Sequence, residues 1–523
     1  MKNIFFLIFV ILNCSCNSIK FVNEYSFLNN PTSNSVTDNI NLQNWHNLDP
    51  ETDSIPGTSV ERAYDELLNG LKGKKVIVAV IDTGLDIDHL SLSNNIWINK
   101  DEKLNGKDDD KNGYIDDIYG WNYLGTSYNE TRDMTRILRD NQVDNIKYSL
   151  VEEEIRKEIK KSNEQLNILN YYIQILEFSK GVISENLDNT KFTIEDVNKI
   201  KTEDEKLNRA KNIYIDFESI GYTEEYLNEG IEQYNDFINY HFNIDFNGRT
   251  SNDNIYDIND TDYGDSNINN IKDSESHSTH VSGIISGDRN NKKGNKGINN
   301  LVEIMALRAI PNGDEYDKDV ARAIRYAVDN GAKIINGSFG KYFSSNPEWV
   351  IDAIRYASKK DVLVVAAAGN ESKDLDLLSN DNYPNDQFFN KNEFSDTFIK
   401  VGASTINLNE NFTAYFSNYG KINVDIFAPG VDIYSSVPND KYKFQDGTSM
   451  ASPVVSGIAS LIMSYFPKLS AKKVKEIILK SGIDIDLKIG NLGSNKHFRE
   501  YSKSGKLINA YNALILASKS KRE

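Results

Sequence analysis

The stretch Val76-Ile-Val-Ala-Val-Ile-Asp-Thr-Gly84 decides the fold. Its first six residues are apolar and mostly β-branched, and a polar Asp82 and a glycine follow. An unbroken apolar run of this length is typical of a strand buried on both faces, as in a parallel sheet covered by helices. We therefore expect a strand over residues 76–81, with Asp82 at its carboxyl end.

Similar apolar runs recur along the chain and alternate with helical patterns. This alternation predicts an α/β fold, a doubly wound and mostly parallel sheet with helices on both faces. In such sheets the functional site gathers at the carboxyl ends of the strands, where Asp82, Ser338 and Asn370 are expected. The other expected strands cover residues 304–307, 333–336, 362–368, 398–403 and 424–427, and the expected helices cover residues 318–330 and 349–359.

The chain divides into segments of different character. Residues 129–246 are charged and carry helical apolar stripes, which predicts a helical hairpin or bundle inserted into the α/β domain. That domain is expected to cover residues 57–128 and 247–515. Residues 19–56 are polar and lack an apolar period, which predicts a tether, and residues 516–523 are expected to form a C-terminal tail.

The N-terminal residues 1–18 have the pattern of a signal peptide. Their apolar stretch, residues 4–12, is too short to cross a bilayer, which takes about 20 residues, but it suits a secretory signal. A cysteine directly after such a stretch resembles a bacterial lipoprotein signal, with Cys16 or Cys14 as the lipidated residue. An ordinary cleaved signal peptide is the alternative. We therefore expect an exported protein, either attached to the cell-envelope membrane by an N-terminal lipid or secreted.

Composition excludes several classes of function. The 523 residues include 59 Lys and Arg against 77 Asp and Glu, a formal net charge of −18, which suits nucleic-acid phosphates poorly. No nucleic-acid partner is therefore expected. Both cysteines lie within the first 16 residues, which excludes a catalytic cysteine, a disulfide framework and a cysteine-based metal centre from the folded domain.

Three further stretches have the residues that nucleophilic catalysis needs. They are His277-Ser-Thr-His-Val-Ser-Gly283, Ala366-Ala-Ala-Gly-Asn370 and Gly447-Thr-Ser-Met-Ala-Ser-Pro453. A serine hydroxyl needs a neighbouring base, which a histidine provides near neutral pH, and a buried carboxylate fixes the tautomer of that histidine. An asparagine amide after a buried strand can donate a hydrogen bond to the oxyanion that develops.

These blocks together resemble the subtilisin-like serine proteases, the subtilases of peptidase family S8. Asp82, His277, Asn370 and Ser449 follow the family's order along the chain. The resemblance covers about residues 57–128 and 249–515. It implies a serine endopeptidase that hydrolyses peptide bonds through an acyl-enzyme.

The resemblance also implies a role for each residue. Ser449 is the nucleophile, His277 the base and Asp82 the residue that orients His277, whereas His280 is structural. The amide of Asn370 and the backbone N–H of Ser449 form the oxyanion hole. The implied substrates are proteins or peptides, and catalysis requires no cofactor. A substrate backbone pairs with strand residues at a pocket lined by Ser338, Phe339, Gly340, Ala367, Ala368 and Gly369.

One residue departs from the family pattern. Ser278 stands where the family nearly always has glycine. The alternative function is therefore a catalytically impaired, peptide-binding protein of the same fold, whose chemistry is lost through Ser278 or through an insertion that occludes the site. A lipase or esterase is disfavoured because no Gly-x-Ser-x-Gly motif surrounds Ser449.

An acidic stretch near residue 110 has oxygen-bearing side chains at alternate positions, as in a calcium loop, with Gly113 at the sixth position. Tyr119 stands at the twelfth position, where an EF-hand has glutamate. A structural Ca²⁺ site and a solvated acidic turn therefore both remain open. The candidate ligands are Asp108, Asp110, Asn112 and Asp116.

Overall fold

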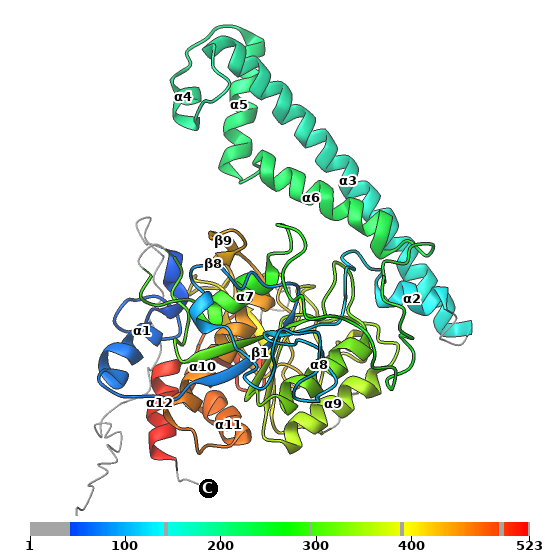
Figure 1. Cartoon of the computed structure of the whole chain (residues 1–523). Helices are drawn as coiled ribbons and strands as arrows, with labels where there is room; N and C mark the ends of the chain where they lie inside the picture. Colours follow the sequence, from blue (N-terminus) through cyan, green and yellow to red (C-terminus); the bar gives the residue numbers. More distant parts are fainter. Residues whose placement is uncertain (1–41, 141–144, 292–293, 388–391, 491–495, 521–523) are drawn as a thin grey trace, which may run out of the picture.

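The computed structural model describes residues 42–140, 145–291, 294–387, 392–490 and 496–520 (Figure 1). The predicted signal peptide, Cys14, Cys16 and residues 19–41 of the predicted tether lie outside these residues. Residues 141–144 of the predicted insertion and residues 521–523 of the predicted tail also lie outside them, whereas the other predicted site residues lie within the described part of the chain.

A nine-stranded sheet forms the centre of the molecule and confirms the predicted fold class. Its strand order is β10-β11-β7-β6-β5-β4-β1-β3-β2, and every pair is parallel except β10–β11. A separate antiparallel hairpin joins β8 to β9. The strands are β1 Val76–Asp82, β2 Gly120–Asn122, β3 Val302–Arg308, β4 Ile334–Gly337, β5 Leu363–Ala367, β6 Phe398–Ser404, β7 Ile426–Pro429, β8 Ile433–Val437, β9 Lys441–Gln445, β10 Ile483–Asp484 and β11 Lys506–Leu507.

Helices cover both faces of the sheet, which explains the unbroken apolar run of β1. Successive residues of a strand point to opposite faces, so Val78 packs into the apolar cluster with α7, α10, α11 and α12, whereas Ala79 packs into the cluster with α8 and α9. Figure 1 shows these two groups on opposite sides of the sheet. The helices are α7 His277–Ser286, α8 Asp317–Asp329, α9 Pro347–Lys359, α10 Thr448–Tyr465, α11 Ala471–Ser481 and α12 Ala510–Lys519.

Two predicted boundaries are wrong. Residues 42–56, expected to belong to a tether, pack on the body instead: they begin with the 3₁₀-helix Leu42–Asn47, and the indole of the fully buried Trp45 donates to the backbone carbonyl of Asp432 at 3.1 Å. The chain then continues through α1, Val60–Arg62, and a π-helical turn, Ala63–Leu68. At the other end, residues 516–519 extend α12 rather than forming a tail, and Ala517 is buried.

A helical arm rises from the body between β2 and α7 (Figure 1). We use this name for residues 133–140 and 145–241, which lie within the predicted insertion. Helix α3 alone has 43 residues, a length of about 65 Å at 1.5 Å per residue. The arm has an apolar cluster of its own, which includes Leu176, Ile183 and Leu227. Its elements are α2 Asp133–Arg139, α3 Asn145–Leu187, α4 Ile194–Lys199, α5 Glu205–Ser219, α6 Glu224–Asp236 and a π-helical turn Phe237–His241.

Within the described ranges, no helix is both long enough and apolar enough to cross a membrane.

Candidate active site

Asp82 and His277 meet at the carboxyl end of β1. Asp82 is the last residue of β1 and is 1% exposed, and its Oδ1 lies 2.7 Å from Nδ1 of His277. His277 is the first residue of α7, whose start is fixed because the backbone N–H of Ser278 donates to Oγ1 of Thr83 at 3.1 Å. The turn after β1 therefore positions both members of this pair.

The carboxylate of Asp82 determines the protonation of His277. Burial alone would lower the pKa of the imidazole, but the charge and hydrogen bond of Asp82 outweigh burial and raise that pKa above 6.5. Because a carboxylate only accepts, Nδ1 carries the proton and Nε2 of the neutral ring is an acceptor. The His277 side chain remains 35% exposed, so that molecules in solution can reach it.

Ser449 lies at the start of α10, where β4 ends. Its hydroxyl donates to the backbone carbonyl of Ser338 at 3.0 Å, and the hydroxyl of Ser338 donates to the carbonyl of Ser449 at 2.9 Å. In the described part of the chain, no hydrogen bond joins the Ser449 hydroxyl to His277. A rotation about the Cα–Cβ bond of Ser449 is needed to release this hydroxyl from the Ser338 carbonyl.

Two hydrogen-bond donors converge in front of Gly447. The amide oxygen of Asn370 accepts from the backbone N–H of Thr448 at 2.9 Å and from its hydroxyl at 2.9 Å, which directs Nδ2 of Asn370 the other way. A Cβ atom on Gly447 would lie 3.4 Å from Nδ2 of Asn370 and 3.4 Å from the backbone nitrogen of Ser449. The φ angle of Gly447, +150°, also disfavours any side chain there, so this space stays open.

The six predicted pocket residues extend two neighbouring strands. Ser338, Phe339 and Gly340 follow β4, and Ala367, Ala368 and Gly369 end or follow β5, its parallel partner. A third segment closes the space at Gly340, because a Cβ there would lie 2.9 Å from the carbonyl oxygen of Tyr383 and 3.4 Å from Nδ2 of Asn382. The sequence patterns missed this segment, which is joined to the segment after Gly340 by a bridge between Tyr383 and Lys341.

Comparison with known proteins identifies the family. A model of the Subtilase family, peptidase S8, matches residues 73–502. The chain belongs to the subtilase family.

This subtilase is similar in sequence to several named proteases. The chain is 36% identical over 261 residues to a thermophilic serine proteinase of Bacillus sp. (strain AK1), a match that covers 50% of the chain and 55% of the relative. It is 35% identical over 234 residues to a cell wall-associated protease of Bacillus subtilis (strain 168), covering 45% of the chain and 24% of the relative. Thermitase of Thermoactinomyces vulgaris is 36% identical over 189 residues, which are 36% of the chain and 61% of thermitase. Each match thus spans only part of the relative's length.

The second histidine of the α7 block has different surroundings from His277. His280 is fully buried, and its Nε2 donates to the backbone carbonyl of Lys443 on β9 at 3.1 Å. Burial lowers the pKa of His280 to about 3, so the ring is neutral. This position holds α7 against the β8–β9 hairpin, in agreement with a structural role.

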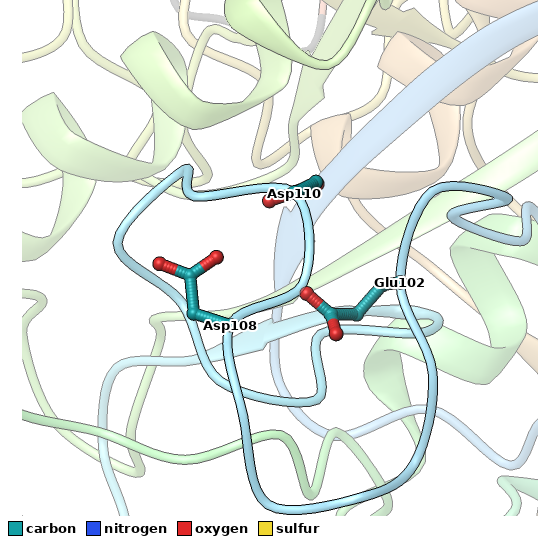
Figure 2. Close-up of side chains that lie close together, drawn as sticks. All are labelled: Glu102, Asp108 and Asp110. Atoms are coloured by element: carbon teal, nitrogen blue, oxygen red, sulfur yellow. The ribbon is translucent and has the colours of Figure 1, made fainter.

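The acidic loop of this subtilase brings together a different set of residues from the one predicted. Figure 2 shows Glu102, Asp108 and Asp110 around a common space, with carboxylate oxygens within 4.8 Å of one another. Asp116 instead accepts from the backbone N–H groups of residues 105 and 106 at 2.8 and 2.9 Å. Asn112 donates to Asp110 at 3.1 Å. Asp116 therefore stabilises a turn and does not join the cluster, whereas Glu102, outside the repeating pattern, was missed.

Proposed function

We propose that the protein is a serine endopeptidase that hydrolyses peptide bonds through an acyl-enzyme on Ser449. The observation that carries this proposal is the 2.7 Å contact between Asp82 and His277, which leaves Nε2 of the neutral ring to act as a base. Membership of the subtilase family and the convergence of two donors in front of Gly447 support it further.

The proposed reaction follows from these positions. Nε2 of His277 takes the hydroxyl proton of Ser449 as its oxygen attacks the scissile carbonyl, and Asp82 stabilises the imidazolium that forms. Nδ2 of Asn370 and the backbone N–H of Ser449 donate to the oxyanion. His277 then protonates the leaving amine, and water hydrolyses the acyl-enzyme by the same route in reverse.

Ser278 does not disturb this arrangement. It is 1% exposed, and its backbone N–H donates to Thr83 while His277 keeps its contact with Asp82. This local geometry favours the active protease over the catalytically impaired alternative.

Labelling with a fluorophosphonate probe tests the proposal. The probe should label the folded full-length protein, and Ser449→Ala should abolish labelling and peptide hydrolysis. Ser452→Ala is the matched control from the same block and should keep its label. His277→Ala should lose nearly all activity, and the double variant should be little worse because the residues act as a unit. An unlabelled but well-folded wild-type protein would favour the peptide-binding alternative.

The proposal extends to substrates and location. Proteins or peptides are the substrates, no nucleic acid is bound and no cofactor takes part in the chemistry. Export through the signal at residues 1–18 places the protein in the cell envelope, with lipid on Cys16 or Cys14, or outside the cell. The name of the cell wall-associated relative supports this location. Replacing each cysteine in turn by serine should release the protein from the membrane fraction for one of the two variants.

A structural Ca²⁺ at Glu102, Asp108 and Asp110 completes the proposal. Carboxylates are the ligands that Ca²⁺ prefers, and a bound cation would relieve the repulsion between three carboxylates this close together. The ion would stabilise the loop before β2 and would take no part in the chemistry.

A further inference from the structure

Helix α6 of the helical arm is attached to the body near both of its ends. Near its start, Glu225 and Glu229 accept from the ammonium group of Lys443 on β9, at 2.7 and 3.3 Å. At its end, Asp236 accepts from the side-chain amide of Asn312 at 2.7 Å. Helix α6 has 13 residues, a length of about 20 Å at 1.5 Å per residue.

The two attachments reach parts of the body that are linked to the two members of the Asp82–His277 pair. At the first attachment, the backbone carbonyl of Lys443 accepts from His280, in the same helix as His277. At the second attachment, Asn312 follows β3, which pairs with β1 up to Asp82. Figure 1 shows α6 on the side of the body where α7, β8 and β9 lie. Helix α6 therefore bridges the parts of the body that are linked to His277 and to Asp82.

The root of the arm is fixed by buried charges. Asp133 of α2 accepts from the ammonium group of Lys341 at 2.9 Å, and Arg136 donates to the backbone carbonyls of residues 314 and 315 at 3.0 and 2.9 Å. Asp133, Arg136 and Lys341 are each at most 3% exposed, and breaking such a pair is strongly destabilising. Lys341 directly follows the pocket residue Gly340, so the root and the pocket share one rigid frame.

The attachment to Lys443 is weak by comparison. The side chains of Lys443, Glu225 and Glu229 are 48%, 70% and 64% exposed. Exposed ion pairs contribute little to stability and are screened by salt. An arm with a rigid root and a weak outer contact can swing open at that contact, which we call the Lys443 latch.

We propose that the helical arm is a strap that admits short peptides and unfolded polypeptides to the site and excludes folded proteins while the Lys443 latch is closed. The proposal rests on the proposed protease function. With the latch closed, the His277 side chain is still 35% exposed, so an extended chain can reach it. A folded protein must approach through the space that α6 crosses, and it therefore needs the latch to open.

The test compares three substrates on the full-length protein: a short chromogenic peptide, a folded globular protein, and the same protein reduced and carboxymethylated. Lys443→Glu, and separately Glu225→Lys with Glu229→Lys, replace two attractive pairs by repulsion. The open population should rise about tenfold, and with it the rate of cleavage of the folded protein. The kcat/KM for the short peptide should not change. Combining all three substitutions restores opposite charges and should restore the wild-type selectivity.

Arg156→Glu is the matched control. Arg156 pairs with Glu152 on the exposed surface of α3, within the same arm, at 2.7 Å. This variant should keep the wild-type selectivity. Salt gives a measurement that needs no variant: at about 1 M salt, where the Debye length is about 3 Å, wild type should cleave the folded protein faster and Lys443→Glu should not.

Two results would overturn the strap. One is an unchanged ratio of folded-protein to unfolded-protein cleavage in the latch variants and at high salt. The other is an equal change for all three substrates, which would place the effect in the chemistry. If the protease function itself fails, wild type will cleave none of the three substrates and will not react with the fluorophosphonate, so the two failures are distinguishable.

Discussion

Replacing Asn370 by alanine separates the chemistry of the site from its stability. The amide nitrogen of Asn370 faces the space in front of Gly447, together with the backbone nitrogen of Ser449. Losing one such donor removes about 2.7–4 kcal/mol of transition-state stabilisation, a fall of about 10²–10³ in kcat, a magnitude known from subtilisin itself. Because the ground-state carbonyl carries little charge, KM should change little.

The same substitution removes two further hydrogen bonds from the fold. The amide oxygen of Asn370 accepts from the N–H and the hydroxyl of Thr448, and each such bond contributes about 1 kcal/mol. We therefore expect the free energy of unfolding to fall by about 2 kcal/mol. Asn299→Ala is the matched control, because this buried amide makes three bonds, to Leu301, Ser460 and Ser464, at the other end of α10. It should lose similar stability and keep its kcat.

Steady-state kinetics on a short chromogenic peptide, with urea unfolding of each variant, measure both effects. A kcat for Asn370→Ala within tenfold of wild type would refute the reasoning, as would a loss that appears only in KM. Either result would mean that Nδ2 does not contact the charge that develops in the reaction.

Three further predictions concern pH and calcium. Because Asp82 raises the pKa of His277 and the reaction needs neutral imidazole, wild-type kcat/KM should rise with pH through a pKa above 6.5. Asp82→Asn should move this rise to lower pH and reduce kcat by about 10⁴. A rise at the same pH in the variant would contradict the role of Asp82 as the partner of His277. Burial lowers the pKa of both His46 and His280 to about 3. Below about pH 6.5 the two rings therefore bind protons in the unfolded chain but not in the folded protein, which favours unfolding. Each histidine should reduce the free energy of unfolding by about 2 kcal/mol at pH 5. Urea unfolding at pH 5 and pH 7 measures this loss. The difference between the two free energies of unfolding should be smaller in His280→Gln than in wild type, while kcat stays unchanged. The same difference in variant and wild type would count against this prediction. A chelator should lower the melting temperature of wild type more than that of Glu102→Gln, and a chelator without effect would end the calcium proposal.

The sheet was predictable because buried parallel strands have unbroken apolar runs. The patterns located β1 and β3 to β7, but they missed the β8–β9 hairpin, whose second strand, Lys441–Gln445, is mostly exposed and polar. They also assigned residues 42–56 to a tether, since a segment held by single contacts such as those of Trp45 has no period to detect. Sequence patterns reveal segments in which buried residues repeat at a regular spacing. They do not reveal a segment that is held to the body by one buried side chain.

The candidate site was predictable where short motifs surround its residues. Asp82, His277, Asn370 and Ser449 each lie in such a motif. Glu102 and Asn382 reach their sites only through tertiary packing, and nothing adjacent in the chain marks them. The attachment of α6 to the body likewise depends on Lys443, which is an ordinary surface lysine in the sequence.

The two ends of the helical arm lie side by side. The carbonyl of His241 accepts from the backbone N–H of Arg132 at 2.9 Å and from the hydroxyl of Thr135 at 2.8 Å. Asp82 and His277 are 195 positions apart, yet the chain between them returns almost to where it left the body. Once the arm has folded on its own apolar cluster, only the shorter segments before and after it remain flexible between Asp82 and His277. The entropy cost of bringing Asp82 and His277 together therefore corresponds to a shorter loop. An insertion anchored in this way can grow or shrink over evolutionary time without stretching the distance between carboxylate and imidazole.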